Sequence, residues 1–132
     1  MQTLTRKLGL KPGMRALILS GPRGYLGALI PRPAGLRIAS AARGSHDFVQ
    51  VFVRSGAELR KVAPRAVQCV APGGPLWITY PKKTSDLAGD LGREEVRAVM
   101  ARLGHHAVTA IAIDETWSGL RFRPRKKMSS PP

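Results

Sequence analysis

The sequence predicts an α/β domain in three layers: a mostly parallel β-sheet with helices on both faces and an antiparallel C-terminal strand. Three observations favour it. Short apolar runs alternate with helical patterns between residues 14 and 123, as they do in chains of β–α units. Two of these runs, 14–19 and 48–53, are apolar almost throughout, which is typical of strands covered on both faces. The chain has 132 residues, 43% of them hydrophobic, which is enough for one domain with its own core.

The first half of the chain is expected to hold two strands, joined by a tight loop and a short helix. Pro31 and Pro33 prevent that helix from continuing, because proline has no backbone N–H to donate. In order, we expect a strand at 14–19, a turn at 20–24, a brief helix at 25–30 and a weaker strand at 36–39.

A strong strand and a capped helix follow. Residues 48–53 (FVQVFV) are rich in β-branched and aromatic side chains, which suit a strand. Ser55 can accept a hydrogen bond from the backbone N–H of Glu58, whose side chain reaches back, so a helix is expected to begin there. Its apolar stripe runs to Val70, and Pro64 inside it predicts a kink or a restart.

The second half of the chain repeats the alternation. Acidic residues in the first turn and basic residues further along favour a helix that starts around Glu94 and is capped by Gly104. The last strand is expected to run antiparallel, at or next to an edge of the sheet. Around this helix we expect a strand at 76–80, a polar loop at 81–92, a strand at 108–113, a hairpin turn at 114–119 and a short strand at 120–123.

Residues 1–123 are therefore expected to form a single Rossmann-like domain, a three-layer sandwich whose parallel strands are joined by right-handed crossovers. Residues 124–132 (PRKKMSSPP) hold nothing that can pack into a core and are expected to form a disordered basic tail. An exposed edge strand could pair with a second copy, but nothing in the sequence requires it. The oligomeric state is left open.

The formal net charge of +14 is large and favours polyanionic partners on electrostatic grounds. Met1 to His46 contains no Asp or Glu, and the last residues are basic. One alternative function is therefore a nucleic-acid-binding module that uses the N-terminal segment and the tail. It would lack a stacking platform for bases, because aromatic residues are few and several fall in predicted core strands. The charge also fits simple compositional drift toward arginine.

Several classes of protein and site are not favoured. Cys69 is the only cysteine, which excludes an internal disulfide and fits a reducing compartment. No signal peptide is recognisable, and no apolar run approaches the ~20 residues that cross a bilayer. We expect a soluble, cytoplasmic protein with no membrane partner. His46, His105 and His106 lack the spacing of a metal site, and the nucleophile-elbow and P-loop motifs do not occur.

A ligand is expected where the parallel strands end. In open α/β sheets the binding crevice lies beyond the carboxyl ends of the strands, at the point where strand order reverses. Here that point falls between the strands at 14–19 and 48–53. The loops that meet there carry glycines, a capped helix start, cations and hydroxyls, which can hold a phosphate or carboxylate. The candidates are Gly21, Arg23, Gly24, Tyr25, Ser55, Lys82, Lys83, Thr84 and Ser85. The plainer alternative is that the glycines make turns and the charges are solvated.

Asp114, Glu115 and Trp117 form a second candidate cluster at the same edge. Two carboxylates could act as acid and base, with the indole as a stacking wall. The favoured interpretation is structural: a carboxylate orders the hairpin, and the indole covers the edge of the sheet.

The order of KPGMRALIL (11–19), a Gly-containing loop, DFVQVFV (47–53), a capped helix and APGGPLWITYPKK (71–83) resembles the core of class I methyltransferases. The resemblance implies S-adenosylmethionine as cofactor. Two features depart from that family. The first loop reads Ser-Gly-Pro-Arg-Gly (20–24) in place of an acidic-x-Gly-x-Gly-x-Gly motif, and residues 37–42 contain no acid to hold the ribose. One strand–helix unit is also missing before Asp47.

A second resemblance covers almost the whole chain. The segments that carry it include LGLKPG (8–13), PRGY (22–25), APGG (71–74) and DETWSGLRF (114–122). They are similar to those of a small bacterial family of domains of unknown function, numbered three thousand and fifty-two. The resemblance implies the same fold and a bacterial setting, and it supplies no activity.

Three functions are consistent with these observations. The leading one is a Rossmann-like domain that binds an anionic small molecule or a partner at the carboxyl end of the sheet, with no recognisable catalytic site. The second is an S-adenosylmethionine- or nucleotide-dependent transferase with an atypical first loop. The third is the nucleic-acid-binding module. The identity of any cofactor is left open.

Overall fold

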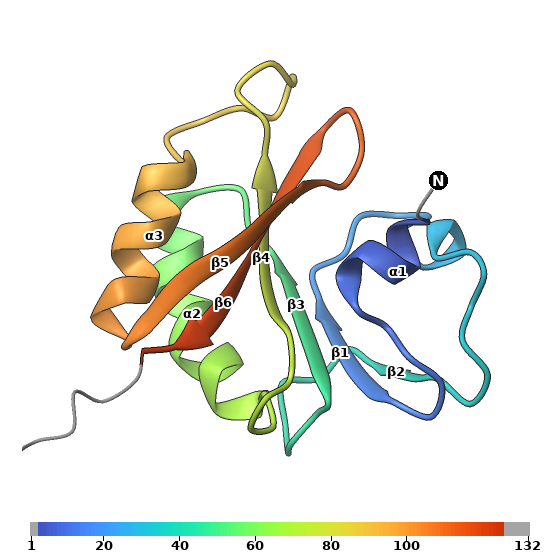
Figure 1. The fold of residues 1–132 in the computed structure, drawn as a ribbon. Helices are drawn as coiled ribbons and strands as arrows, with labels where there is room; N and C mark the ends of the chain where they lie inside the picture. The colour runs from blue at the N-terminus through green and yellow to red at the C-terminus, as the bar shows by residue number, and fades with distance from the viewer. Residues whose placement is uncertain (1–2, 126–132) are drawn as a thin grey trace, which may run out of the picture.

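The computed structural model describes residues 3–125, and its strands form one six-stranded sheet (Figure 1). The strands are β1 (Arg15–Leu19), β2 (Arg37–Ala39), β3 (Phe48–Phe52), β4 (Leu76–Pro81), β5 (His105–Ala112) and β6 (Trp117–Pro124). Their order in the sheet is β2-β1-β3-β4-β6-β5. β1 to β4 pair in parallel, whereas β6 runs antiparallel to both β4 and β5. The predicted fold class is confirmed, and the antiparallel last strand lies next to an edge.

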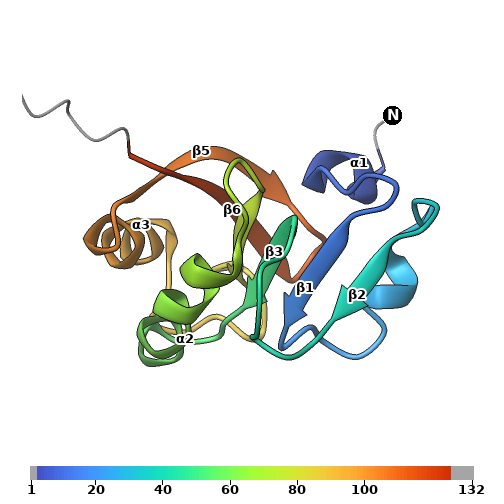
Figure 2. The same ribbon diagram turned by 90° about the horizontal axis from the view of Figure 1, so that it is seen from below.

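Helical elements cover both faces of the sheet. α2 (Gly56–Cys69) and α3 (Arg93–Arg102) pack on one face. The short α1 (Leu4–Leu8) and the 3-10 turn η1 (Leu26–Ala28) lie on the other face, as Figures 1 and 2 show. Among residues 3–125, no helix is long and apolar enough to cross a membrane.

Each face of the sheet has its own hydrophobic core, because successive side chains of a strand point to opposite faces. β3 illustrates this division. Val49 and Val51 enter the core under α2 and α3, whereas Phe48 and Phe52 enter the core on the side of α1. All four side chains are at most 2% exposed, which is why the strand reads as an unbroken apolar run in the sequence.

α2 begins and runs much as the sequence predicts. The Ser55 hydroxyl accepts from the Glu58 N–H at 3.1 Å, while the Glu58 carboxylate reaches back one residue further than expected and accepts from the Arg54 N–H at 2.6 Å. The predicted restart at Pro64 does not occur, and the helix is continuous through it. Pro64 is exposed, so the missing hydrogen bond falls on the outer side and leaves the buried stripe intact.

α1 was not predicted from the sequence. It has five residues, too few for a helix that is stable by itself. The Thr3 side chain accepts from the Arg6 N–H at its start, and Gly9, with φ of 86°, ends it in the left-handed conformation. The buried Trp77 indole N–H donates to the Leu8 carbonyl at 2.8 Å, so packing on the sheet stabilises this helix.

The C-terminal hairpin is longer than predicted. β5 begins at His105 rather than at 108, and β6 begins at Trp117 rather than at 120, because pairing between the two strands extends the ladder in both directions. Pro124, expected in the tail, is the last residue of β6, and the Arg125 N–H donates to the Gly104 carbonyl at 2.7 Å. The rest of the expected tail, 126–132, lies outside the described residues.

Candidate functional site

The topology gathers four loops at one end of the sheet. The strand order reverses between β1 and β3, since the chain passes from β1 to β2 on one side and then to β3 on the other. The loops after β1, β3 and β4 and the β5–β6 turn all lie at the end where the parallel strands finish (Figure 1). We call this end the rim. It is the place that the sequence predicted for a ligand.

A cavity of about 510 Å³ opens at the rim, beside the ends of β1 and β2. Four of the predicted residues line it, Gly21, Arg23, Gly24 and Tyr25, all from the loop after β1. The residues on the β2 side of the cavity were not predicted from the sequence. This side is formed by the end of β2 and the residue after it: Ile38, Ala39 and Ser40. The position of Ser40 directly after a predicted strand at the rim is the signal that could have identified it.

The backbone of the β1 loop is folded tightly. Ser20 has φ of 59°, a left-handed conformation that is uncommon for a residue with a side chain and is often found at functional sites. Gly24 has φ of 85°, and the Tyr25 N–H closes the turn on the Pro22 carbonyl at 3.0 Å. Within residues 3–125, the N–H groups of Arg23 and Gly24 have no hydrogen-bond acceptor. They are available to an anion.

Arg23 is the only charged side chain among the residues that line the rim cavity. It is exposed. Within the described part of the chain, the one ion pair within 4 Å joins Arg97 to Glu94, so no carboxylate neutralises Arg23. The cavity therefore combines one unpaired cation, free N–H groups and the hydroxyls of Ser20 and Ser40, with no carboxylate in its lining.

Tyr25 anchors the loop to the sheet. Its hydroxyl donates to the Gln50 side-chain oxygen at 2.8 Å, and the Gln50 amide donates to the Thr79 hydroxyl at 3.1 Å. Burial raises the pKa of the Tyr25 phenol well above its ordinary value; the hydrogen bond with Gln50 opposes this rise, and the charge of Asp114 adds to it. The phenol therefore stays neutral and positions the loop. The lone Gln within FVQVFV was the sequence signal for this network.

At the start of α2, where the sequence predicted part of an anion site, a carboxylate of the chain itself is bound. The Ser55 hydroxyl is used as the helix cap, and the Gly56 N–H donates to the Asp90 carboxylate at 3.2 Å. A carboxylate at this position is favoured by the partial positive charge of a helix N-terminus. Ser55 does not line the rim cavity.

The β4 loop lies against the β5–β6 turn rather than over the rim cavity. The Lys82 N–H donates to the Thr116 carbonyl at 2.8 Å, and the Ser85 hydroxyl donates to the Lys82 carbonyl at 2.8 Å. Lys83 and Thr84 are exposed at the tip of this loop. The structure thus separates the predicted anion-binding residues into three groups: the β1 loop at the rim cavity, Ser55 at the start of α2, and the β4 loop.

Asp114 orders the hairpin in which it lies. One of its carboxylate oxygens accepts from the N–H groups of Thr116 and Trp117, both at 2.8 Å. The Trp117 ring is 6% exposed and packs edge-on against Phe52, with centroids 5.1 Å apart. Glu115 is exposed. This geometry agrees with the structural interpretation of the cluster. Among residues 3–125, no three His, Cys, Asp or Glu side chains gather as metal ligands.

Comparison with known sequences and structures identifies the fold. No family model and no curated protein matches the chain. The ribosomal protein L11 methylase from Lactobacillus delbrueckii subsp. bulgaricus matches with a TM-score of 0.64 and 10% identity over 92% of this chain and 75% of its own. A SAM-dependent methyltransferase from Aquifex aeolicus matches with 0.63 and 14%, over 90% and 86%. The N-methyltransferase NodS from Bradyrhizobium japonicum WM9 matches with 0.61 and 15%, over 93% of each chain.

These similarities establish a Rossmann-like fold of the methyltransferase type. At 10–15% identity they show the fold alone. Other methyltransferases of this fold are longer, and the chain spans about half their length. The resemblance to the bacterial family of unknown function stays a prediction.

Proposed function

We propose that this protein binds a small molecule carrying a phosphate or a similar anionic group in the rim cavity. The observation that carries the proposal is the lining of that cavity. It presents an unpaired Arg23, free N–H groups at Arg23 and Gly24, and no carboxylate. Oxygen atoms of a phosphate accept hydrogen bonds from guanidinium and backbone N–H groups alike.

The position of the cavity supports a nucleotide as the carrier of that phosphate. Ligands of open α/β sheets bind at the carboxyl ends of the strands, next to the reversal of strand order. The cavity lies at the carboxyl ends of β1 and β2, one strand spacing away from the reversal between β1 and β3. At the end of β2, where an acid commonly holds a ribose, the chain offers the Ser40 hydroxyl. An arginine near this position suits a phosphorylated ribose better than a free diol.

A substitution of Arg23 tests the proposal. We expect adenosine diphosphate to stabilise the wild-type protein by about 2.7 kcal/mol at a hundred times its Kd, which corresponds to a clear rise in Tm. Arg23→Gln should weaken this binding by roughly tenfold or more, because it removes a charge-assisted hydrogen bond. Calorimetric titration of both proteins measures the difference.

Lys61→Gln is the matched control, since Lys61 is exposed on α2 and also loses one positive charge. Its affinity for the nucleotide should equal that of the wild type. Equal affinities for wild type and Arg23→Gln, or no binding of adenosine diphosphate or inorganic phosphate at millimolar concentration, contradict the proposal.

S-adenosylmethionine-dependent transfer is the second candidate function, and the shared fold favours it. Against it stands the lining of the rim cavity, because the sulfonium and amino groups of that cofactor are cationic and no carboxylate faces them. S-adenosylhomocysteine is the probe that separates the two candidates. A rise in Tm with this nucleoside, and none with adenosine diphosphate, favours the transferase.

A further inference from the structure

Acidic residues are segregated to one end of the molecule. Of the eight Asp and Glu residues, all but Asp47 lie at or near the rim. They occupy the first turns of α2 and α3, the loop between β4 and α3, and the β5–β6 turn. We call the opposite end, where β1 to β4 begin, the basal end. Its only acidic residue is Asp47, and its cations are Lys11, Arg15, Arg37, Arg102, Arg121, Arg123 and Arg125.

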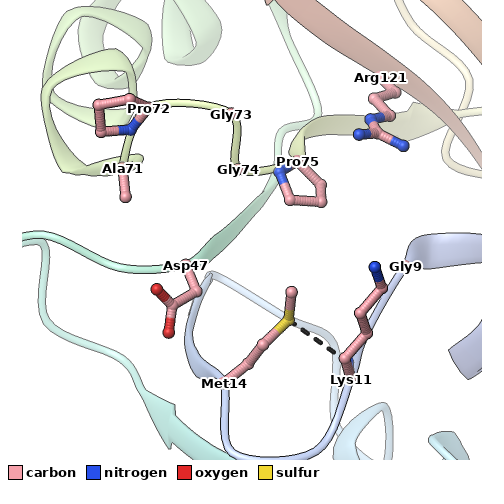
Figure 3. A pocket seen from close by; sticks show the side chains of 10 residues that line it. All are labelled: Gly9, Lys11, Met14, Asp47, Ala71, Pro72, Gly73, Gly74, Pro75 and Arg121. Carbon is pink, nitrogen blue, oxygen red and sulfur yellow. Dashed lines mark hydrogen bonds between the residues drawn. The ribbon is translucent and has the colours of Figure 1, made fainter.

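A basal cavity of about 310 Å³ lies at the centre of this end. Its charged lining residues are two cations, Lys11 from the segment before β1 and Arg121 from β6, and one acid, Asp47. Figure 3 shows the two cationic side chains directed toward the same space beside Pro75, while the Asp47 carboxylate points away from both. An Asp47 carboxylate oxygen accepts from the Arg15 N–H at 2.8 Å. Asp47 therefore holds the start of β1 and forms no ion pair with either cation.

Among these cations, Arg121 has a buried nitrogen, Nε, that lacks a hydrogen-bond partner within the described residues. Partial burial, and then the charge of Arg123 two residues along the strand, lower the pKa of its guanidinium. A buried donor without a partner carries a desolvation cost, so the fold holds this guanidinium beside the basal cavity at some expense of stability.

A second hollow continues the positive surface. It has a volume of about 680 Å³, and Arg123 and Arg125 are the cations in a lining that is otherwise mostly apolar. The turn 71–74 contributes to the lining of both hollows, so they lie on its two sides. The cations that line the two hollows therefore extend across the basal end from the segment before β1 to the end of β6.

We propose that the basal end binds the phosphodiester backbone of a nucleic-acid duplex, with one phosphate in the basal cavity between Lys11 and Arg121 and further phosphates along Arg123 and Arg125. This surface is distinct from the rim cavity. A single small anion would satisfy Lys11 and Arg121 alone, whereas cations spread over two hollows suit a repeating row of phosphates.

The aromatic residues indicate how such a duplex would be held. Every aromatic side chain of the chain is buried, with at most 6% exposure. None can stack on an unpaired base, which is how single strands are usually bound. We therefore expect backbone contacts, no preference for base sequence, and weaker binding of single strands.

Apolar residues argue against a lipid surface at this end. The exposed large hydrophobic side chains among residues 3–125 are Leu26, Ile30 and Val108. Leu26 and Ile30 belong to the segment around η1, and Val108 lies within β5. The two basal hollows include none of them.

The test is fluorescence anisotropy with a mixed-sequence DNA duplex of about 20 base pairs, titrated with the full-length protein over a range of salt. Each phosphate contact contributes about 0.9 to the slope of log affinity against log salt. The double variant K11Q/R123Q should lower that slope by about 2 and weaken binding roughly tenfold or more at low salt. Both side chains are exposed, so folding should be unaffected, as Tm will show.

The matched control is K61Q/R93Q, which removes the same charge from exposed positions on α2 and at the start of α3. It should keep the wild-type slope. A second full-length variant, K126Q/K127Q, changes residues outside the described part of the chain.

Four results overturn the proposal. They are an equal loss in K61Q/R93Q, a loss confined to K126Q/K127Q, tighter binding of single strands than of duplex, and binding of phosphatidylserine vesicles without binding of DNA. A selective loss in K11Q/R123Q, with the same affinity for a second duplex of scrambled sequence, supports it.

Discussion

Tyr25 shows how one buried polar side chain can set the geometry of a ligand-binding loop. Its ring packs edge-on against Phe52, with centroids 4.7 Å apart, and its hydroxyl reaches Gln50 in the middle of β3. A buried amide normally needs partners on both sides, and Gln50 finds them in Tyr25 and Thr79. The loop that carries Arg23 is therefore fixed to two strands through a chain of hydrogen bonds.

The raised pKa of Tyr25 predicts a stability change at alkaline pH. The phenol ionises near pH 10 in the unfolded chain but stays neutral to higher pH in the folded protein. Its contribution is therefore fully present below about pH 10 and is lost as the pH rises above that value, with a slope of up to ~1.4 kcal/mol per pH unit.

Urea unfolding of wild type and Tyr25→Phe at pH 9, 10 and 11 measures this contribution. The free energy of unfolding should fall more steeply for the wild type, because the variant has no group to ionise at this position. Parallel pH profiles for the two proteins would show that the phenol is not held neutral.

At the scale of elements, the connection between α2 and β4 is the most constrained turn. A Cβ added to Gly74 would lie 2.5 Å from the Asp47 carbonyl oxygen and 3.1 Å from the Ala71 carbonyl oxygen. Both are backbone atoms, which cannot move aside without shifting the start of β3 or the end of α2. This turn also lines both basal hollows.

Gly74→Ala should therefore destabilise the protein by about 2 kcal/mol, within the range for overpacking. The matched control is Gly27→Ala, because a Cβ at Gly27 meets no atom within 4 Å. That variant should keep the wild-type stability or gain slightly. Thermal unfolding compares the three proteins, and equal losses in both variants would contradict the clash at Gly74.

Strong local patterns are what the sequence predicted well. β3 and α2 were recognised from an apolar run and a cap, and both lie as expected. α1 was missed because its stability depends on Trp77, far away in the sequence. β5 and β6 were predicted too short, because each strand is extended by its pairing with the other. Such non-local contributions leave little trace in local composition.

The end of the sheet that holds the candidate site was predictable, but its cavity lies beside β1 and β2 rather than between β1 and β3, and only some of its lining residues were named. The rim follows from strand order, which the alternation of elements already implied. The separation of Lys82 from Arg23 depends on how the β4 loop bonds to Thr116, and no spacing in the sequence reports that bond. Ser40 directly follows the strand predicted at 36–39, so this member of the site could have been named from the sequence.

Across the whole molecule, positive and negative charges are distributed unevenly along the direction of the strands. Acidic residues gather at the rim, and the basal end is almost purely cationic. Within the described residues, a single ion pair at 3.9 Å offsets the many like charges. Self-repulsion of this kind destabilises a compact state and is screened by salt.

We therefore expect Tm to rise when sodium chloride is increased from 10 to 200 mM, with a gain in stability on the order of 1 kcal/mol. The variant K11Q/R123Q, with two fewer charges at the basal end, should gain less than the wild type does. Differential scanning calorimetry measures both, and a Tm that falls with salt would show that attractive pairs dominate.

The hydrogen bond between Trp77 and Leu8 joins residues 69 positions apart, and this separation has a consequence for synthesis on the ribosome. Trp77, which anchors α1, is added to the growing chain only 69 residues after Leu8. At about 5–20 residues per second, that interval is roughly 3–14 s. During that interval the Leu8 carbonyl of α1 has no indole N–H to accept from. The apolar face of β1 that α1 helps to cover stays exposed for the same time. The layer that contains α1 is thus completed only after β4 has been made.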